Sequence, residues 1–247
     1  MKLSKSQRIY FFLVLVLAVF SGINVYMPQG ALSIPYELPA PKPVIAIVLF
    51  FGIGLVYGGI GFLGLQLSNK LGFSDIWDPD VTNNQRFVQP AIIGTGIGIF
   101  FIISDTALSH FNLAGHIPHP PFPSSLIASV VAAIGEEIIF RLFFISFWLW
   151  LISRILFKGK WKNLLFWIIT GFSALAFSLG HLPSVMFLFN YTSLAKIPMF
   201  LLFEIVLLNG VLSFFAAYYF RKYGFVAAVS IHFWTDFAWH VIFGLIQ

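Results

Sequence analysis

Six side chains that could do chemistry lie inside long apolar stretches of this chain. They form three groups along the sequence: Glu136, Glu137 and Arg141, then His181, then His232 and Asp236. A charge at membrane depth costs about 2.5–3.5 kcal/mol on insertion scales, so such residues are rare and usually functional. A carboxyl group that works with an imidazole can activate water as a general base. The three groups are therefore candidates for one hydrolytic site.

In the first group, the two carboxylates point in different directions around a helix. Glu137 and Arg141 are four residues apart, so they share one helix face and can neutralise each other. A structural ion pair would explain Glu137, but it would not explain Glu136, which points about 100° away around the helix. Glu136 therefore requires another partner or a chemical task. His181, which lies just before a predicted helix break at Pro183, is the imidazole that we expect to work with it.

His232, Asp236 and His240 repeat every four residues and therefore lie on one stripe of a helix. Two interpretations of this stripe are open. In the first, His232 and Asp236 make polar contacts between packed helices. In the second, they face a water-filled cavity together with Glu136 and His181, as metal ligands or as stabilisers of a developing oxyanion.

The elements that must position these groups are helices in a membrane. Hydrophobic residues make up 59% of the chain, charged residues only 9%, and the mean hydropathy is +0.92, which excludes an ordinary soluble protein. Seven apolar stretches are long enough to cross a bilayer, and lipid requires such stretches to be helical. They cover residues 9–27, 44–67, 91–113, 125–156, 163–182, 197–220 and 225–246. The predicted fold class is all-α, a polytopic transmembrane helical bundle of about seven to eight spans.

Basic residues follow a topological pattern. Lys and Arg residues cluster before the first stretch and in every second connection after it, whereas the opposite connections carry only Lys42 and Lys196. The positive-inside rule therefore predicts a cytoplasmic N-terminus. The net charge of +5 reflects this topology rather than nucleic-acid binding, because the basic residues form no continuous stripe. We expect the first stretch to be a retained span rather than a cleaved signal peptide.

Three short patterns occur in order on separate apolar stretches: Glu-Glu-x-x-x-Arg at 136–141, Phe-x-x-x-His at 177–181 and His-x-x-x-Asp at 232–236. Together they resemble the motifs of the CPBP family, the CAAX proteases and bacteriocin-processing enzymes that are also called the Abi family of intramembrane proteases. The resemblance covers residues 125–247, which we expect to form a catalytic core of about four spans. Residues 1–124, with about three spans, resemble the family only in being hydrophobic.

The resemblance implies a role for each matching residue. Glu136 is similar to the general base and His181 to its partner, whereas His232 and Asp236 match the positions of the oxyanion hole. Glu137 and Arg141 match a pair that supports the site. The resemblance implies no obligatory cofactor but leaves zinc open, and Glu136, His181, His232 and Asp236 would then be its ligands.

The chain departs from the commoner family pattern in two places. Leu142 stands where many members have Gly, and Asp236 stands where many have Asn. An ionised carboxylate cannot donate a hydrogen bond to an oxyanion. Asp236 would therefore have to be protonated, orient His232, or bind a metal.

The expected function is hydrolysis of a peptide bond in a membrane-associated or lipidated peptide or protein, in a bacterial cell membrane, with no nucleic-acid partner. A non-catalytic scaffold or a bacteriocin self-immunity protein would use the same residues for helix packing. A proton-coupled transporter would use them as a relay, but it would also predict broken helices and inverted repeats, and the sequence shows neither clearly.

Two expectations concern placement. At a rise of 1.5 Å per residue, the predicted boundaries put His181 and His232 roughly 17 Å apart in depth. A single site then requires tilted spans, a fifth helix that starts later, or a last helix that enters deeper. Outside the motifs, Glu204 is expected to reach toward the interface or pair with Lys196, Asp105 and His110 to lie in a hydrated end, and the connection from His116 to Pro121 to be a plain turn-rich loop.

Overall fold

A computed structural model describes residues 3–33, 38–111 and 115–246. These residues form helices and connections and contain no strand, which confirms the all-α fold class. Seven helical stretches are long and apolar enough to span a membrane, as predicted. Their bounds are Lys5–Asn24, Lys42–Lys70, Asn84–Leu108, Ser124–Leu156, Lys162–Leu188, Met199–Tyr223 and Phe225–Leu245.

Several of these stretches contain short segments of different helical winding. The α-helices are α1 (Lys5–Asn24), α2 (Lys42–Lys70), α3 (Gln89–Leu108), α4 (Ser124–Glu137), α5 (Ser146–Leu149), α6 (Lys162–Gly180), α7 (Leu182–Leu188), α8 (Met199–Tyr223) and α9 (Phe225–Asp236). The π-helical segments are η2 (Asn84–Val88), η3 (Ile138–Ile145), η4 (Trp150–Leu156) and η6 (Phe237–Ile242). The 3₁₀ turns are η1 (Gly30–Leu32), η5 (Leu194–Lys196) and η7 (Phe243–Leu245).

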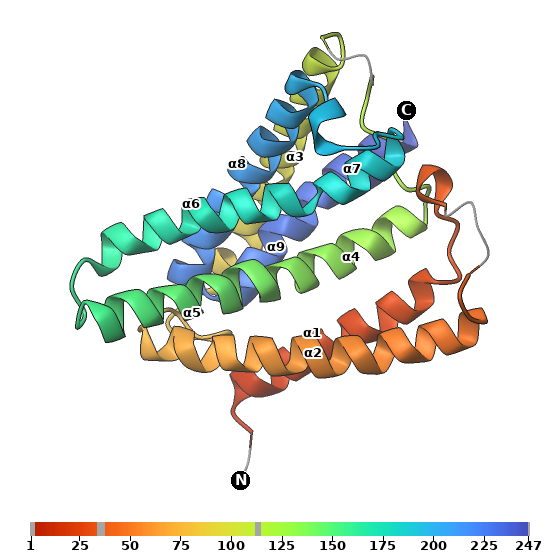
Figure 1. The fold of residues 1–247 in the computed structure, drawn as a ribbon. Helices are drawn as coiled ribbons and strands as arrows, with labels where there is room; N and C mark the ends of the chain where they lie inside the picture. Colours follow the sequence, from red (N-terminus) through yellow and green to blue (C-terminus); the bar gives the residue numbers. More distant parts are fainter. Residues whose placement is uncertain (1–2, 34–37, 112–114, 247) are drawn as a thin grey trace.

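The last span lies at the centre of the bundle. α9 packs against α3, α4 and α8, and it is the most buried of the seven spans (Figure 1). α1 and α2 pack against each other, and from there α1 contacts α4 while α2 contacts η3. The three N-terminal spans therefore pack directly on the four C-terminal ones. The division of the chain into parts 1–124 and 125–247 remains a prediction.

Two glycines bring α3 close to the central helix. A Cβ atom on Gly98 would lie 2.8 Å from the carbonyl oxygen of Thr235, and one on Gly94 would collide with the backbone of Ile231. The hydroxyl of Thr235 also donates to the carbonyl of Gly94 at 3.1 Å. Small residues thus allow backbone contact between these two spans. The contact fixes the part of α9 that carries His232.

The start of α9 lies inside the protein rather than at its surface. The connection after α2 folds over it, with Phe73 and Ile76 buried, and Phe225 is fully buried beneath it. Gly224 has a φ of +88° and leaves no space for a Cβ atom against the backbone of Asp75. The buried start of α9 and the continuation of the fifth span past His181 to Leu188 both bring His181 and His232 closer in depth than the predicted boundaries did.

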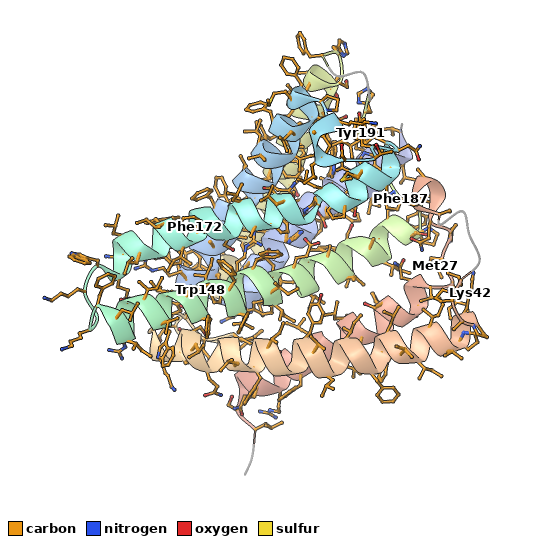
Figure 2. The ribbon with its side chains drawn as sticks, in the orientation of Figure 1. Met27, Lys42, Trp148, Phe172, Phe187 and Tyr191 are labelled. Atoms are coloured by element: carbon orange, nitrogen blue, oxygen red, sulfur yellow. The ribbon has the colours of Figure 1, made fainter. Side chains whose placement is uncertain are left out.

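The basic connections meet at one end of the bundle. Trp77, in the connection after α2, lies between Lys5 at the start of α1 and Arg86 of η2, each 4.1 Å from the centre of its ring. The side chain of Lys162 donates to the carbonyl of Leu71, which links a third connection to the same end. Lys42 lies at the opposite end (Figure 2). We call the end formed by these connections the basic face.

Candidate active site

All four residues predicted to act on substrate line one cavity. It has a volume of about 260 Å³, and its walls come from α3, α4, α6, α7, α8, α9 and η6 together with the connection before α4. The cavity residues from the three motifs are Glu136, His181, His232 and Asp236. The walls are otherwise mainly apolar, as is usual for a ligand-binding cavity. The structure therefore brings the three motifs to one place.

Behind the cavity, Glu137 joins two motifs in a buried network. Its carboxylate lies 3.2 Å from Nε of Arg141 and accepts a hydrogen bond from Nδ1 of His232 at 2.8 Å. Arg141 also donates to the hydroxyl of Ser213 at 2.9 Å and lies 4.8 Å from the centre of the Phe177 ring. Glu137 and Arg141 are both fully buried. This network fixes the orientation of the His232 ring.

The second nitrogen of His232 faces the other two carboxylates. Nε2 lies 3.5 Å from an oxygen of Glu136 and 3.5 Å from an oxygen of Asp236. The Glu136 side chain is 32% exposed, whereas the adjacent Glu137 is fully buried. The two neighbouring glutamates thus differ as the helix geometry predicts. The ionic partner of Glu136 is His232, and the Glu136 side chain lines the cavity.

One ring nitrogen of His181 has a defined hydrogen-bond partner. Its Nδ1 lies 2.8 Å from the carbonyl oxygen of Phe177. Because a carbonyl can only accept, Nδ1 carries the hydrogen, and a neutral ring then keeps its lone pair on Nε2. His181 lies at the junction of α6 and α7, where Pro183 occupies the first turn of α7. The predicted break is present, although the chain resumes a helix as far as Leu188.

Two π-helical segments begin directly after site residues. η3 follows Glu137 and η6 follows Asp236. π-Helical turns are rare and frequently occur at functional sites, because the wider turn changes the direction of the side chains that follow. Arg141 lies in η3, and the cavity residue His240 lies in η6. Sequence periodicity carries no signal for either segment.

Sequence reasoning missed two members of this site. Phe177 was part of a motif but had no assigned role, and its ring contacts Arg141 and lies edge-on to the rings of His181 and His232 at 4.9 and 5.9 Å. Ser213, which accepts from Arg141, comes from α8, a span without a recognised motif. A serine in an apolar helix is too common to single out, whereas the motif itself pointed to Phe177.

The possible zinc ligands predicted from the sequence are Glu136, His181, His232 and Asp236. In the part of the chain that the structure describes, no group of three or more His, Asp and Glu side chains is arranged to hold a metal ion. Glu137 engages Nδ1 of His232 and a carbonyl engages Nδ1 of His181, so Nε2 is the nitrogen of each ring that could hold a metal. In the described residues these side chains are not gathered around one point as a preformed zinc centre requires.

Two expectations about buried carboxylates outside the motifs are wrong. Glu204 is fully buried and neither carboxylate oxygen has a hydrogen-bond partner among the described residues, so it does not reach the interface or pair with Lys196. Asp105 is fully buried rather than hydrated, because Nδ1 of His116 contacts its carboxylate at 2.5 Å.

The connection from His116 to Pro121 is a docked segment rather than a plain loop. Nδ1 of His119 lies 2.9 Å from Nδ1 of His240, and its ring lies 4.6 Å from that of Trp239. Asp105 also accepts a hydrogen bond from the backbone N–H of Ile117 at 3.0 Å. The segment therefore covers the end of the cavity near η6.

A comparison with known families agrees with this site. Residues 118–238 match the model of the family described as Type II CAAX prenyl endopeptidase Rce1-like. No curated protein and no solved structure matches the chain. The matched residues include all three motifs and every ionic contact around His232. Over this segment the chain is similar to the Rce1-like family of type II CAAX prenyl endopeptidases, and its seven long apolar helices support an integral membrane protein.

Proposed function

We propose that this protein is an intramembrane endopeptidase that hydrolyses a peptide bond of a membrane-associated or lipidated peptide with a water activated by Glu136 and His181. The main support is the contrast between two adjacent carboxylates. Glu137 is buried in an ionic network, whereas Glu136 lines the cavity and is 32% exposed in its side chain. A general base must reach both water and substrate, and Glu136 meets that requirement.

The reaction begins with a water between Glu136 and His181. A carboxylate oxygen of Glu136 accepts one proton of the water, while the lone pair on Nε2 of His181 accepts a hydrogen bond from the other. The water oxygen attacks the carbonyl carbon of the scissile bond and forms a tetrahedral intermediate. Glu136 then transfers its proton to the leaving nitrogen, the C–N bond breaks, and the free carboxylate is regenerated.

His232 stabilises the negative oxygen of the intermediate. Because Nδ1–H donates to Glu137, the ring can donate from Nε2 only as an imidazolium. Glu137 on one side and Asp236 on the other supply the opposing charges. Asp236 orients and balances His232 and makes no direct contact with the oxyanion, because an ionised carboxylate cannot donate. Donors placed where charge develops contribute strongly to catalysis of this kind.

The test compares purified wild type with Glu136→Gln in detergent on a quenched library of lipidated peptides. Asp105→Asn serves as the matched control, since it also replaces a carboxylate by an amide but outside the cavity. We expect wild type and the control to cleave and Glu136→Gln to be inactive, and we expect a strong chelator to leave wild-type cleavage unchanged. Loss of cleavage with chelator would instead favour zinc. A wild type that cleaves no peptide would favour a non-catalytic scaffold or a bacteriocin self-immunity role.

A further inference from the structure

The cavity occupies the half of the bundle that lies away from the basic face. The fourth span runs from Ser124, near the cavity, to the basic connection that follows η4, and the cavity contacts it only between Ala128 and Glu136 of α4. α6 runs in the opposite sense, and the cavity contacts only its last turn and α7. The remaining walls include the connection from Ile117 to Pro120 and His240 of η6, which belong to the same end.

The distribution of basic residues orients this half of the bundle. The described Lys and Arg residues at the basic face are Lys5, Arg8, Lys70, Arg86, Arg154, Lys158, Lys160, Lys162, Arg221 and Lys222. The connections at the other end carry only Lys42 and Lys196 among the described residues. Such an excess marks the cytoplasmic side of a membrane protein. The half that contains the cavity therefore faces away from the cytoplasm.

The end of the cavity is covered, so a substrate requires a way in from the side. His119 holds the covering segment to η6 through His240, and Asp105 holds it to α3 through His116. On the side between α4 and α7, α4 lines the cavity with the small side chains of Ala128 and Ala132. Across the cavity from them, Ser184 of α7 is exposed on the surface.

The shape and lining of the cavity indicate what it holds. His232 and His240 both line it and are eight residues apart, which corresponds to about 12 Å along a helix. An extended peptide of about three to four residues has this length. Ile205 and Leu208 of α8 and Leu188 of α7 line the cavity with apolar side chains. The occupant is therefore a short extended segment with apolar side chains.

We propose that the cavity opens between α4 and α7 toward the extracytoplasmic leaflet, and that the substrate is an extended apolar segment next to the membrane in an exported or membrane-anchored peptide. The substrate part of this inference rests on the proposed function, whereas the direction of the opening does not. A substrate presented only from the cytoplasm would meet the basic face, where the packed start of α9 separates it from Glu136.

The direction of opening can be tested by cysteine labelling, because the chain contains no cysteine. Ser184→Cys places a thiol at the proposed opening, and Asn84→Cys places a matched exposed thiol at the basic face without removing a charge. Spheroplasts that express each variant are treated with a membrane-impermeant maleimide before and after permeabilisation. We expect Ser184→Cys to be labelled in sealed spheroplasts and Asn84→Cys only after permeabilisation. The reverse pattern would overturn the proposal.

The substrate class requires a second measurement. Two membrane-anchored reporters carry the same apolar segment, selected as a substrate in detergent, on the extracytoplasmic or the cytoplasmic side of one anchor. We expect wild type to cleave the extracytoplasmic reporter and Glu136→Gln to lose that cleavage. Cleavage of the cytoplasmic reporter alone would overturn this inference and leave the endopeptidase proposal intact. Absence of any cleavage in detergent would overturn the endopeptidase proposal and with it the substrate class. Labelling of Ser184→Cys from outside would still support the direction of the opening.

Discussion

Two buried pairs of carboxylate and imidazole lie at different depths of this bundle. At the site, Glu137 accepts a hydrogen bond from His232 at 2.8 Å, and near the covered end of the cavity Asp105 contacts His116 at 2.5 Å. Both carboxylates are fully buried, but His232 has a second nitrogen beside further carboxylates in a cavity, whereas His116 is 45% exposed and anchors a connection. A buried pair of this kind therefore does not mark a catalytic site by itself. Access to a third, partly exposed acid distinguishes the two.

The largest expected effect on activity comes from replacing that third acid, Glu136. Glu136→Gln should lower the rate of peptide hydrolysis by about 10²–10⁴-fold, the range typical of a lost general base. Its stability should remain close to that of wild type, because the side chain is partly exposed. Initial rates on a selected fluorogenic peptide, with thermal unfolding in the same detergent, provide the measurement. A variant that is correctly inserted and fully active would contradict the role of Glu136.

Glu137→Gln should instead act on stability. It leaves Arg141 buried without an opposite charge, and removal of one partner of a buried ion pair costs about 3–5 kcal/mol. Chemical denaturation in detergent micelles would measure the loss. If Glu137→Gln proved as stable as wild type while Glu136→Gln unfolded easily, the contrast between the two glutamates would be wrong.

An intermediate effect depends on pH at the covered end of the cavity. Burial lowers the pKa of His119 to about 4 from 6.5. The unfolded chain then binds more protons than the folded protein between these values, so stability falls as the pH decreases from about 6.5 to about 4. The loss is at most about 3 kcal/mol. His119→Phe should show a shallower decline of unfolding temperature over this window, and an identical decline in both proteins would contradict the assignment.

The smallest effect is expected at the outer pair. Asp105→Asn weakens the contact with His116, and because His116 is partly exposed the cost should be about 1 kcal/mol. Hydrolysis should remain within a few-fold of wild type, since the pair lies outside the cavity lining. Unfolding and activity measured on one preparation would test both statements. Inactivation comparable with that of Glu136→Gln would remove the distinction between the two pairs.

Sequence alone predicted the helical class, the seven spans and four of the residues that line the cavity. These features were predictable because spans need about 20 apolar residues and because a polar residue within them stands out clearly. The direction of Glu136 away from Glu137 followed from helix geometry alone. The catalytic roles of these residues remain predictions for the experiments above.

Other features depended on contacts between distant parts of the chain and were therefore not predictable. Glu204 was expected near the interface, but packing of α8 buries it completely. The docking of His119 on His240 joins residues 121 positions apart, and no local pattern encodes it. The depth of His232 was misjudged because the connection that covers Phe225 looked like an ordinary polar loop in the sequence.

The central position of α9 also bears on how the protein reaches the membrane. This span is both the most buried of the seven and the one with the lowest mean hydropathy, since it carries His232 and Asp236. During synthesis it emerges after the six spans before it, and lipid alone offers little to retain a helix with these polar groups. Its stable insertion depends on packing against α3, α4 and α8. The site therefore forms only after these earlier spans are in place.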